Sequence, residues 1–193
     1  MPTVPTREEA LALLHEHTQG ESLRNHALAV EAGMREMARR RGGDEHLWGV
    51  IGLLHDLDYE RWPDPNEHAR QTAVILRERG WAEEIVLPIL GHNPVHGQAR
   101  DTDAARVLYA IDELCGFVVA CALVRPGRNL GTLEPKSVIK KMKDKAFARQ
   151  VDRECIRAGA AELGLELGDL CEAVIVALRG IAPQLGLTVA AEG

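Results

Sequence analysis

Histidine and aspartate side chains that could bind metal ions recur over the first 112 residues of the chain. His55 and Asp56 are adjacent and close the apolar run VIGLL. Neighbouring residues on a helix point about 100° apart, so an imidazole and a carboxylate at this place can address one site from adjacent angles. Both groups are ligands that borderline and hard divalent metals prefer. The pair is therefore a candidate edge of a metal site.

Four further residues of the same types stand at predicted helix ends or inside otherwise apolar helical segments: His26, His68, His92 and Asp112. Together with the pair they could fill two adjacent metal positions. Each alone could equally be a structural residue, because a histidine at a helix end is commonly solvated or hydrogen-bonded. An acid within an apolar helix, as at position 112, needs a partner, since an unpaired buried carboxylate is costly. The ordered set favours a metal site, with His96 as a rival of His92.

The elements that must position these residues are helices, because apolar residues recur at helical spacing and no strand alternation is present. Thr6 and Glu9 form a predicted capping box at the start of a first helix. A second helix covers 22–41 with His26 close to its apolar stripe, and a third covers 45–59 with the His-Asp pair at its C-terminal end.

The later helices are read in the same way. A fourth helix is predicted over 66–80 with His68 in its first turn, and a short fifth closes at Gly91, so that His92 stands at a helix terminus. Asp101 is the predicted cap of a long sixth helix, and two amphipathic helices near 150–163 and 168–182 finish the chain. The predicted fold class is all-α, a single-domain helical bundle.

Length, composition and charge exclude several functions. The 193 residues are 46% hydrophobic, which suffices for one domain without disulfides. The net charge of −6 argues against general nucleic-acid binding. No transmembrane run or leader is seen, so we expect a soluble, cytoplasmic protein that binds no membrane. The sequence leaves a homo-oligomer open. The four cysteines lack metal-site spacing and are predicted to be small buried hydrophobes: Cys115, Cys121, Cys155 and Cys171.

The order H…HD…H…H…D on an all-α chain resembles the HD-domain metal-dependent phosphohydrolase superfamily. The resemblance covers about residues 20–125, the expected HD-like core, and residues 134–184 would form a C-terminal helical extension within one domain of residues 1–193. It implies a first metal held by His26, His55, Asp56 and Asp112. Members with two further histidines hold a second metal; those positions match His68 and His92, with Asp56 bridging.

The implied cofactor is one or two divalent transition-metal ions, with manganese, iron, nickel, cobalt and zinc not distinguished. The implied function is a metal-dependent phosphohydrolase of a small phosphorylated metabolite or nucleotide, with a metal-bound hydroxide as nucleophile. A mixed-valent di-iron oxygenase of the same superfamily and a non-catalytic binding module are the alternatives. The chain lacks the signatures of the superfamily's cyclic-dinucleotide phosphodiesterases and alarmone hydrolases, since the HD pair continues as LDYE.

Further residues are candidates for catalysis and substrate binding. Glu60 stands four residues after Asp56 and would share a face with it if the helix continues, as an acid or a water-orienting group; it could also be a solvated carboxylate. Arg125, Lys136 and Lys140 are candidates for holding a phosphate. The arginine could instead cap helix carbonyls, and the lysines could form a solvated face.

Overall fold

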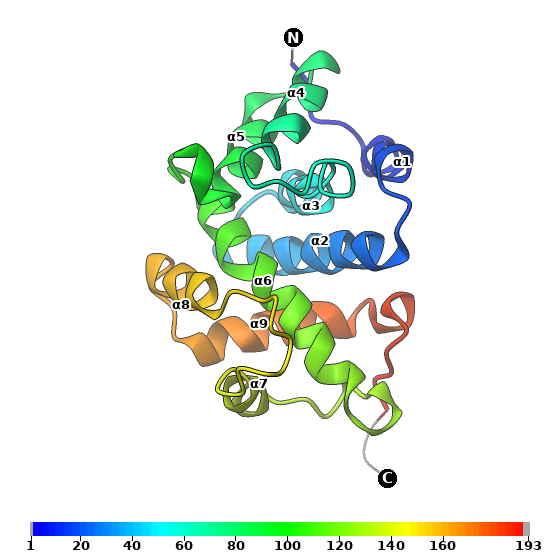
Figure 1. Ribbon diagram of the computed structural model, residues 1–193, viewed down its shortest axis with the longest axis vertical. Helices are drawn as coiled ribbons and strands as arrows, with labels where there is room; N and C mark the ends of the chain where they lie inside the picture. Colours follow the sequence, from blue (N-terminus) through cyan, green and yellow to red (C-terminus); the bar gives the residue numbers. More distant parts are fainter. Residues whose placement is uncertain (1, 191–193) are drawn as a thin grey trace.

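The computed structural model describes residues 2–190, and within them the chain folds into nine α-helices with three short 3-10 helices (Figure 1). Only two isolated β-bridges, and no strands, occur in this range. The α-helices are α1 (Arg7–His17), α2 (Glu21–Arg41), α3 (Glu45–Leu54), α4 (Arg70–Glu78), α5 (Glu83–His92), α6 (Asp103–Leu123), α7 (Pro135–Lys141), α8 (Arg153–Glu162) and α9 (Leu167–Arg179). The predicted all-α class is confirmed. The division into a core and an extension of one domain stays a prediction.

Local capping signals set where several helices begin. The Thr6 side chain accepts from the backbone N–H of Glu9 at 3.2 Å, and the Glu9 carboxylate accepts from the backbone N–H of Thr6 at 2.7 Å, which confirms the predicted capping box of α1. At α6 the predicted cap is wrong by one residue. Thr102 caps this helix, because its hydroxyl accepts from the backbone N–H of Ala105 at 3.2 Å.

The long helix α6 runs diagonally through the middle of the molecule, with α2 to α5 on one side and α7 to α9 on the other (Figure 1). A glycine lets α3 approach α2 closely. A Cβ atom on Gly52 would stand 2.8 Å from the carbonyl oxygen of Val30, too close for any larger residue. This approach matters for the site, because Gly52 lies three residues before His55 and Val30 one turn after His26.

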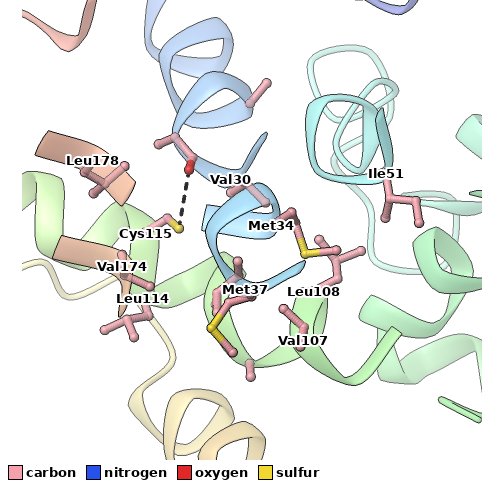
Figure 2. Close-up of a cluster of buried hydrophobic side chains, with 14 of the residues drawn as sticks. Val30, Met34, Met37, Ile51, Val107, Leu108, Leu114, Cys115, Val174 and Leu178 are labelled. Carbon is pink, nitrogen blue, oxygen red and sulfur yellow. Dashed lines mark hydrogen bonds between the residues drawn. The ribbon is translucent and has the colours of Figure 1, made fainter. Parts of the chain in front are cut away.

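The apolar core is continuous across the helix interfaces (Figure 2). It includes Met34 of α2, Ile51 of α3, Leu108 of α6 and Val174 of α9, all buried. Cys115 lies in this core with its thiol directed to the carbonyl oxygen of Ala29 at 3.7 Å. The predicted burial is confirmed for three cysteines, while Cys155 is half-buried, and all four are free thiols.

Two predicted helix ends are wrong. α3 ends at Leu54, and the backbone then makes tight turns, with the N–H of Leu57 donating to Leu54 and that of Tyr59 to Asp56. The cause is Asp58, whose carboxylate accepts from the backbone N–H of Thr72 at 2.8 Å and whose own N–H donates to the Thr72 hydroxyl at 3.2 Å. This pairing pulls the segment away from a helical path. α4 correspondingly begins only at residue 70.

None of the helices in residues 2–190 combines the length and the apolar character that crossing a bilayer requires.

Close packing of α6 against α8 gives a test of the fold. A Cβ atom on Gly159 would lie 2.4 Å from the Cα atom of Ala110. We expect Gly159→Ala to lower the free energy of unfolding by about 1–3 kcal/mol, because the overpacking outweighs the gain in helix propensity. Gly168→Ala in α9 is the control: a Cβ there meets nothing within 4 Å, so stability should rise by about 0.5–1 kcal/mol. Chemical denaturation measures both, and equal stabilities of the two variants would contradict the packing.

Candidate metal centre

All six predicted metal ligands lie in one cluster, although they come from five places in the chain. His26 lies in α2, the His55–Asp56 pair follows α3, and the other three lie before α4, at the end of α5 and in the middle of α6: His68, His92 and Asp112. The donor atoms form two groups, and within each group all lie within 4.8 Å of one another. The first triad is His26, His55 and Asp112, and the second triad is Asp56, His68 and His92.

In the first triad the imidazole nitrogens and the carboxylate are in close contact. His26 Nε2 lies 2.9 Å from Asp112 Oδ1 and 3.2 Å from His55 Nε2. His55 Nε2 lies 3.3 Å from the same Asp112 oxygen. His55 is fully buried, whereas the side chains of His26 and Asp112 are 22% and 21% exposed. The cluster is therefore accessible from the side of His26 and Asp112.

Asp56 of the second triad also contacts the histidines of the first. Its Oδ1 atom is 3.3 Å from His68 Nε2 and 3.5 Å from His92 Nε2. The same oxygen is 3.3 Å from His55 Nε2, and Oδ2 is 3.7 Å from His26 Nε2. One carboxylate thus contacts histidines of both groups, which is the geometry of a bridging ligand.

Hydrogen bonds on the far side of three imidazoles direct a lone pair into the cluster. The Nδ1 atoms of His55 and His92 donate to carbonyl oxygens three residues earlier, those of Gly52 and Ile89, at 2.8 and 2.5 Å. His68 Nδ1 donates to Asp58 Oδ1 at 2.9 Å. A neutral imidazole that donates from Nδ1 is an acceptor at Nε2, the arrangement that metal-binding histidines adopt.

The donor set itself fits bound cations. His68 Nε2 and His92 Nε2 face each other at 3.1 Å, and both are lone-pair atoms when Nδ1 carries the hydrogen. Two facing lone pairs repel unless a proton or a cation lies between them. Nitrogen and carboxylate oxygen together suit a divalent transition metal, so the residues present fit the cofactor that the sequence implied.

The electrostatics of the cluster agree with this chemistry. Burial alone would lower the pKa of His55, but the carboxylates of Asp56 and Asp112 outweigh it and raise that pKa well above its usual value. Burial opposes ionisation of the two acids, yet the neighbouring histidines hold the pKa of both well below the ordinary range. Glu113 behaves differently: burial and the adjacent Asp112 raise its pKa to about 7. The metal-free cluster therefore holds ionised acids and at least one bound proton.

Asp58 is a functional candidate that the sequence did not single out. Its side chain is fully buried, and it orients His68 while also binding the backbone of Thr72. The available signal was a second acid two residues after the pair, in the same apolar stretch. Its role depends on a contact with α4, which no spacing within the segment reveals.

His96, the rival of His92, lies outside the cluster. Its Nε2 atom contacts the carbonyl oxygen of His68 at 2.6 Å, and the neighbouring Asn93 side chain donates to the same oxygen at 3.1 Å. Both groups therefore hold the backbone that presents His68. The second triad contains His92 instead.

The Glu60 side chain forms its hydrogen bonds at the start of α2 and not at the metal cluster. The chain does not continue as a helix after Leu54, so the predicted shared face with Asp56 is wrong. Both Glu60 carboxylate oxygens accept backbone N–H groups, those of Gln19 at 2.6 Å and Gly20 at 2.9 Å, directly before α2. Glu60 thus satisfies the start of that helix.

The three predicted phosphate-binding residues are not brought to the cluster. Arg125 stands just beyond the end of α6, roughly 20 Å along the helix axis from Asp112 at about 1.5 Å per residue. Its guanidinium donates to the Thr132 hydroxyl at 2.6 Å. Lys136 is 82% exposed and pairs with Glu134 at 2.7 Å, and Lys140 is exposed on the same short helix α7, which packs against α9. No contact in residues 2–190 links these three residues to the cluster, and their role in substrate binding stays a prediction.

The fold and the cluster define a class of protein, an all-α bundle with a histidine and aspartate centre for divalent metal. Residues 23–116 match the family model of the HD domain. The chain therefore contains an HD domain, as the resemblance in its sequence predicted, and HD domains belong to a superfamily of metal-dependent hydrolases. Comparison with curated proteins and with solved structures found no match.

Removal of the Asp58 carboxylate tests its positioning role. We expect Asp58→Ala to weaken metal binding at the second triad by about 10–100-fold, because His68 loses the partner that fixes its ring. Metal content at controlled free-metal concentration measures the effect. Asp64→Ala is the control, since the exposed Asp64 carboxylate in the same connection accepts hydrogen bonds from Asn66, whereas the bond from Asp64 to the His68 N–H uses the backbone and is kept. Asp58→Asn keeps one acceptor and should bind metal at an intermediate level; full metal content in Asp58→Ala would refute the role.

Metal binding should be pH-dependent. His55 with its raised pKa holds a proton in the metal-free protein, and a metal must displace it. We therefore expect the apparent affinity to fall by up to about tenfold for each unit of pH decrease per proton displaced, with protons released on binding. Calorimetric titration in buffers of different ionisation enthalpy counts those protons. An affinity that is constant between about pH 6 and 8 would contradict this expectation.

Proposed function

We propose that this protein is a metal-dependent phosphohydrolase that acts on a small phosphorylated metabolite or nucleotide. The observation that carries the proposal is that Asp56 of the second triad also contacts the first triad, and that the donor atoms of each triad lie close enough together for one ion. His26, His55 and Asp112 would hold one ion, His68 and His92 the other, and Asp56 would contact both. Bound ions of this kind lower the pKa of a water that they share and neutralise phosphoryl oxygens.

The protein's own groups set how a substrate would approach. His26 and Asp112 are the most exposed members of the cluster, at 22% and 21%, against 16% for Asp56, 12% for His68 and 4% for His92. A phosphoryl group would therefore approach from the side of His26 and Asp112. Tyr59, 40% exposed, lies beside the second triad with its ring edge-on to His68, at 5.0 Å between centroids.

Metal reconstitution followed by phosphate release tests the function. Metal-free protein is loaded separately with manganese, cobalt, nickel, iron and zinc, and hydrolysis of p-nitrophenyl phosphate is measured. We expect activity with at least one ion and none without metal. Asp56→Ala should abolish it, because both ions lose a shared ligand. His15→Ala is the matched control, since this histidine is exposed on α1 and outside the cluster.

Other outcomes assign the centre differently. Two irons in protein purified without added metal, with oxygen uptake and no phosphate release from any substrate, would replace hydrolysis by oxygenation. Unchanged metal content in both His26→Ala and Asp56→Ala would show that the cluster is not the metal centre and would overturn the proposal.

A further inference from the structure

The face of α6 that carries Asp112 continues as an open surface beyond it. Gly116 and Ala120 follow at intervals of four residues, so they lie on the same side of the helix, and both are only half-buried. A Cβ atom on Gly116 would have one neighbour within 4 Å, His26 Nδ1 at 3.8 Å. The small residues therefore leave free space that begins at the first triad and extends along α6.

The other edge of this open face is bounded by the segment 143–152, between α7 and α8. The Phe147 ring lies edge-on to Phe117, at 5.5 Å between centroids, and the backbone of Asp152 is close enough to the Glu113 carboxyl group to oppose the rise of its pKa. On α6, Glu113 lies about 100° around the helix axis from Asp112, and Phe117 lies about 100° from Gly116. Figure 1 shows the segment crossing α6 in yellow. The open face thus lies between the metal cluster and this segment.

The segment is held in one shape by its own hydrogen bonds. The Arg153 guanidinium donates to the carbonyl oxygens of Ala148 at 3.1 Å and Val151 at 2.8 Å. The Asp144 carboxylate accepts the backbone N–H of Ala146 at 3.1 Å and that of Phe147 at 3.3 Å. A segment fixed in this way can present side chains at defined positions without paying the entropy of ordering on binding.

The cations that this segment presents are not neutralised by the protein. Lys143, Lys145 and Arg149 are exposed, and within residues 2–190 none of them has a carboxylate within ion-pair distance. Lys141 differs, because it lies 3.7 Å from the Asp144 carboxylate and over the Phe147 ring. The same segment also carries two acids, Asp144 and Asp152, but both carboxylates accept backbone N–H groups, so the three cations have no ion-pair partner among them. Cations without such a partner attract and bind anions.

We propose that Lys143, Lys145 and Arg149 bind a second anionic group of the substrate, while the phosphoryl group to be hydrolysed lies at the metal cluster and the body of the molecule crosses Gly116 and Ala120. This inference rests on the proposed function and narrows its substrate class. The substrate is a phosphoester that carries another phosphate or carboxylate group at its far end. A compact monoester without that group uses the metal cluster alone.

A comparison of two substrate types tests the inference on the metal-loaded protein of 193 residues. The probes are p-nitrophenyl phosphate and a series of alkanediol bisphosphates of increasing chain length. The test variant replaces the three cations of the segment by alanine. The control variant removes the same charge from three surface ion pairs elsewhere: Arg40→Ala, Arg79→Ala and Arg157→Ala.

We expect the test variant to raise KM for the best bisphosphate by about 10–100-fold, the effect of losing charge-assisted hydrogen bonds. The kcat/KM of the test variant for p-nitrophenyl phosphate should change less than about twofold. The control variant should have the same kcat and KM as the wild type for p-nitrophenyl phosphate and for the bisphosphate. Ala120→Leu, which fills the open face one turn beyond Gly116, should also weaken only the bisphosphate. Equal KM values for the bisphosphate in wild type and test variant would overturn the inference.

Failure of the proposed function is distinguishable from failure of this inference. If the wild type hydrolyses neither probe with any metal, the phosphohydrolase proposal fails. The segment is then judged by calorimetric binding of the same bisphosphates to metal-loaded protein. Tighter binding by the wild type than by the test variant supports the anion site, and equal binding refutes it.

Discussion

The structure depends on the convergence of lone pairs from imidazoles and carboxylates on one small volume. Histidine nitrogens that face one another at 3.1–3.2 Å are unfavourable neighbours unless positive charge lies between them. Despite burial, nearby acids raise the pKa of His55 and of His68, which favours a proton at each of the two contacts when no metal is bound. With metal bound, the same atoms become ligands. The repulsion in the absence of positive charge is the physical reason why the cluster selects a cation.

Packing of helices far apart in sequence produces this convergence. The close approach of α2 and α3 at Gly52 brings His26 and His55 within contact, and the position of α6 against α2 adds Asp112. The second triad depends on a different device. With one buried carboxylate, Asp58 binds the first turn of α4 at the N–H of Thr72 and fixes the ring of His68. The two triads are thus supported by different parts of the fold, and Asp56 of the second contacts the histidines of both.

The helices that follow α6 add charge to the surroundings of the site. Arg153 holds the carbonyl groups of segment 143–152. Lys143, Lys145 and Arg149 of this segment are exposed, and the segment contacts α6 through the rings of Phe147 and Phe117. Under the proposed binding mode, these cations would meet the second charge of a doubly charged phosphoester outside the metal cluster.

The sequence by itself determined the helical class, the capping box at Thr6 and the six residues of the cluster, because helix signals are local and because few side-chain types bind divalent metals. It did not determine that α3 stops at Leu54, that Asp58 supports His68, or that Arg125 lies far from Asp112. Spacing along one helix shows which residues share a face, but it contains no information about the helix that packs on that face. The tertiary structure alone decided which cations remain unpaired beside the site, since that depends on contacts between segments such as 143–152 and α6.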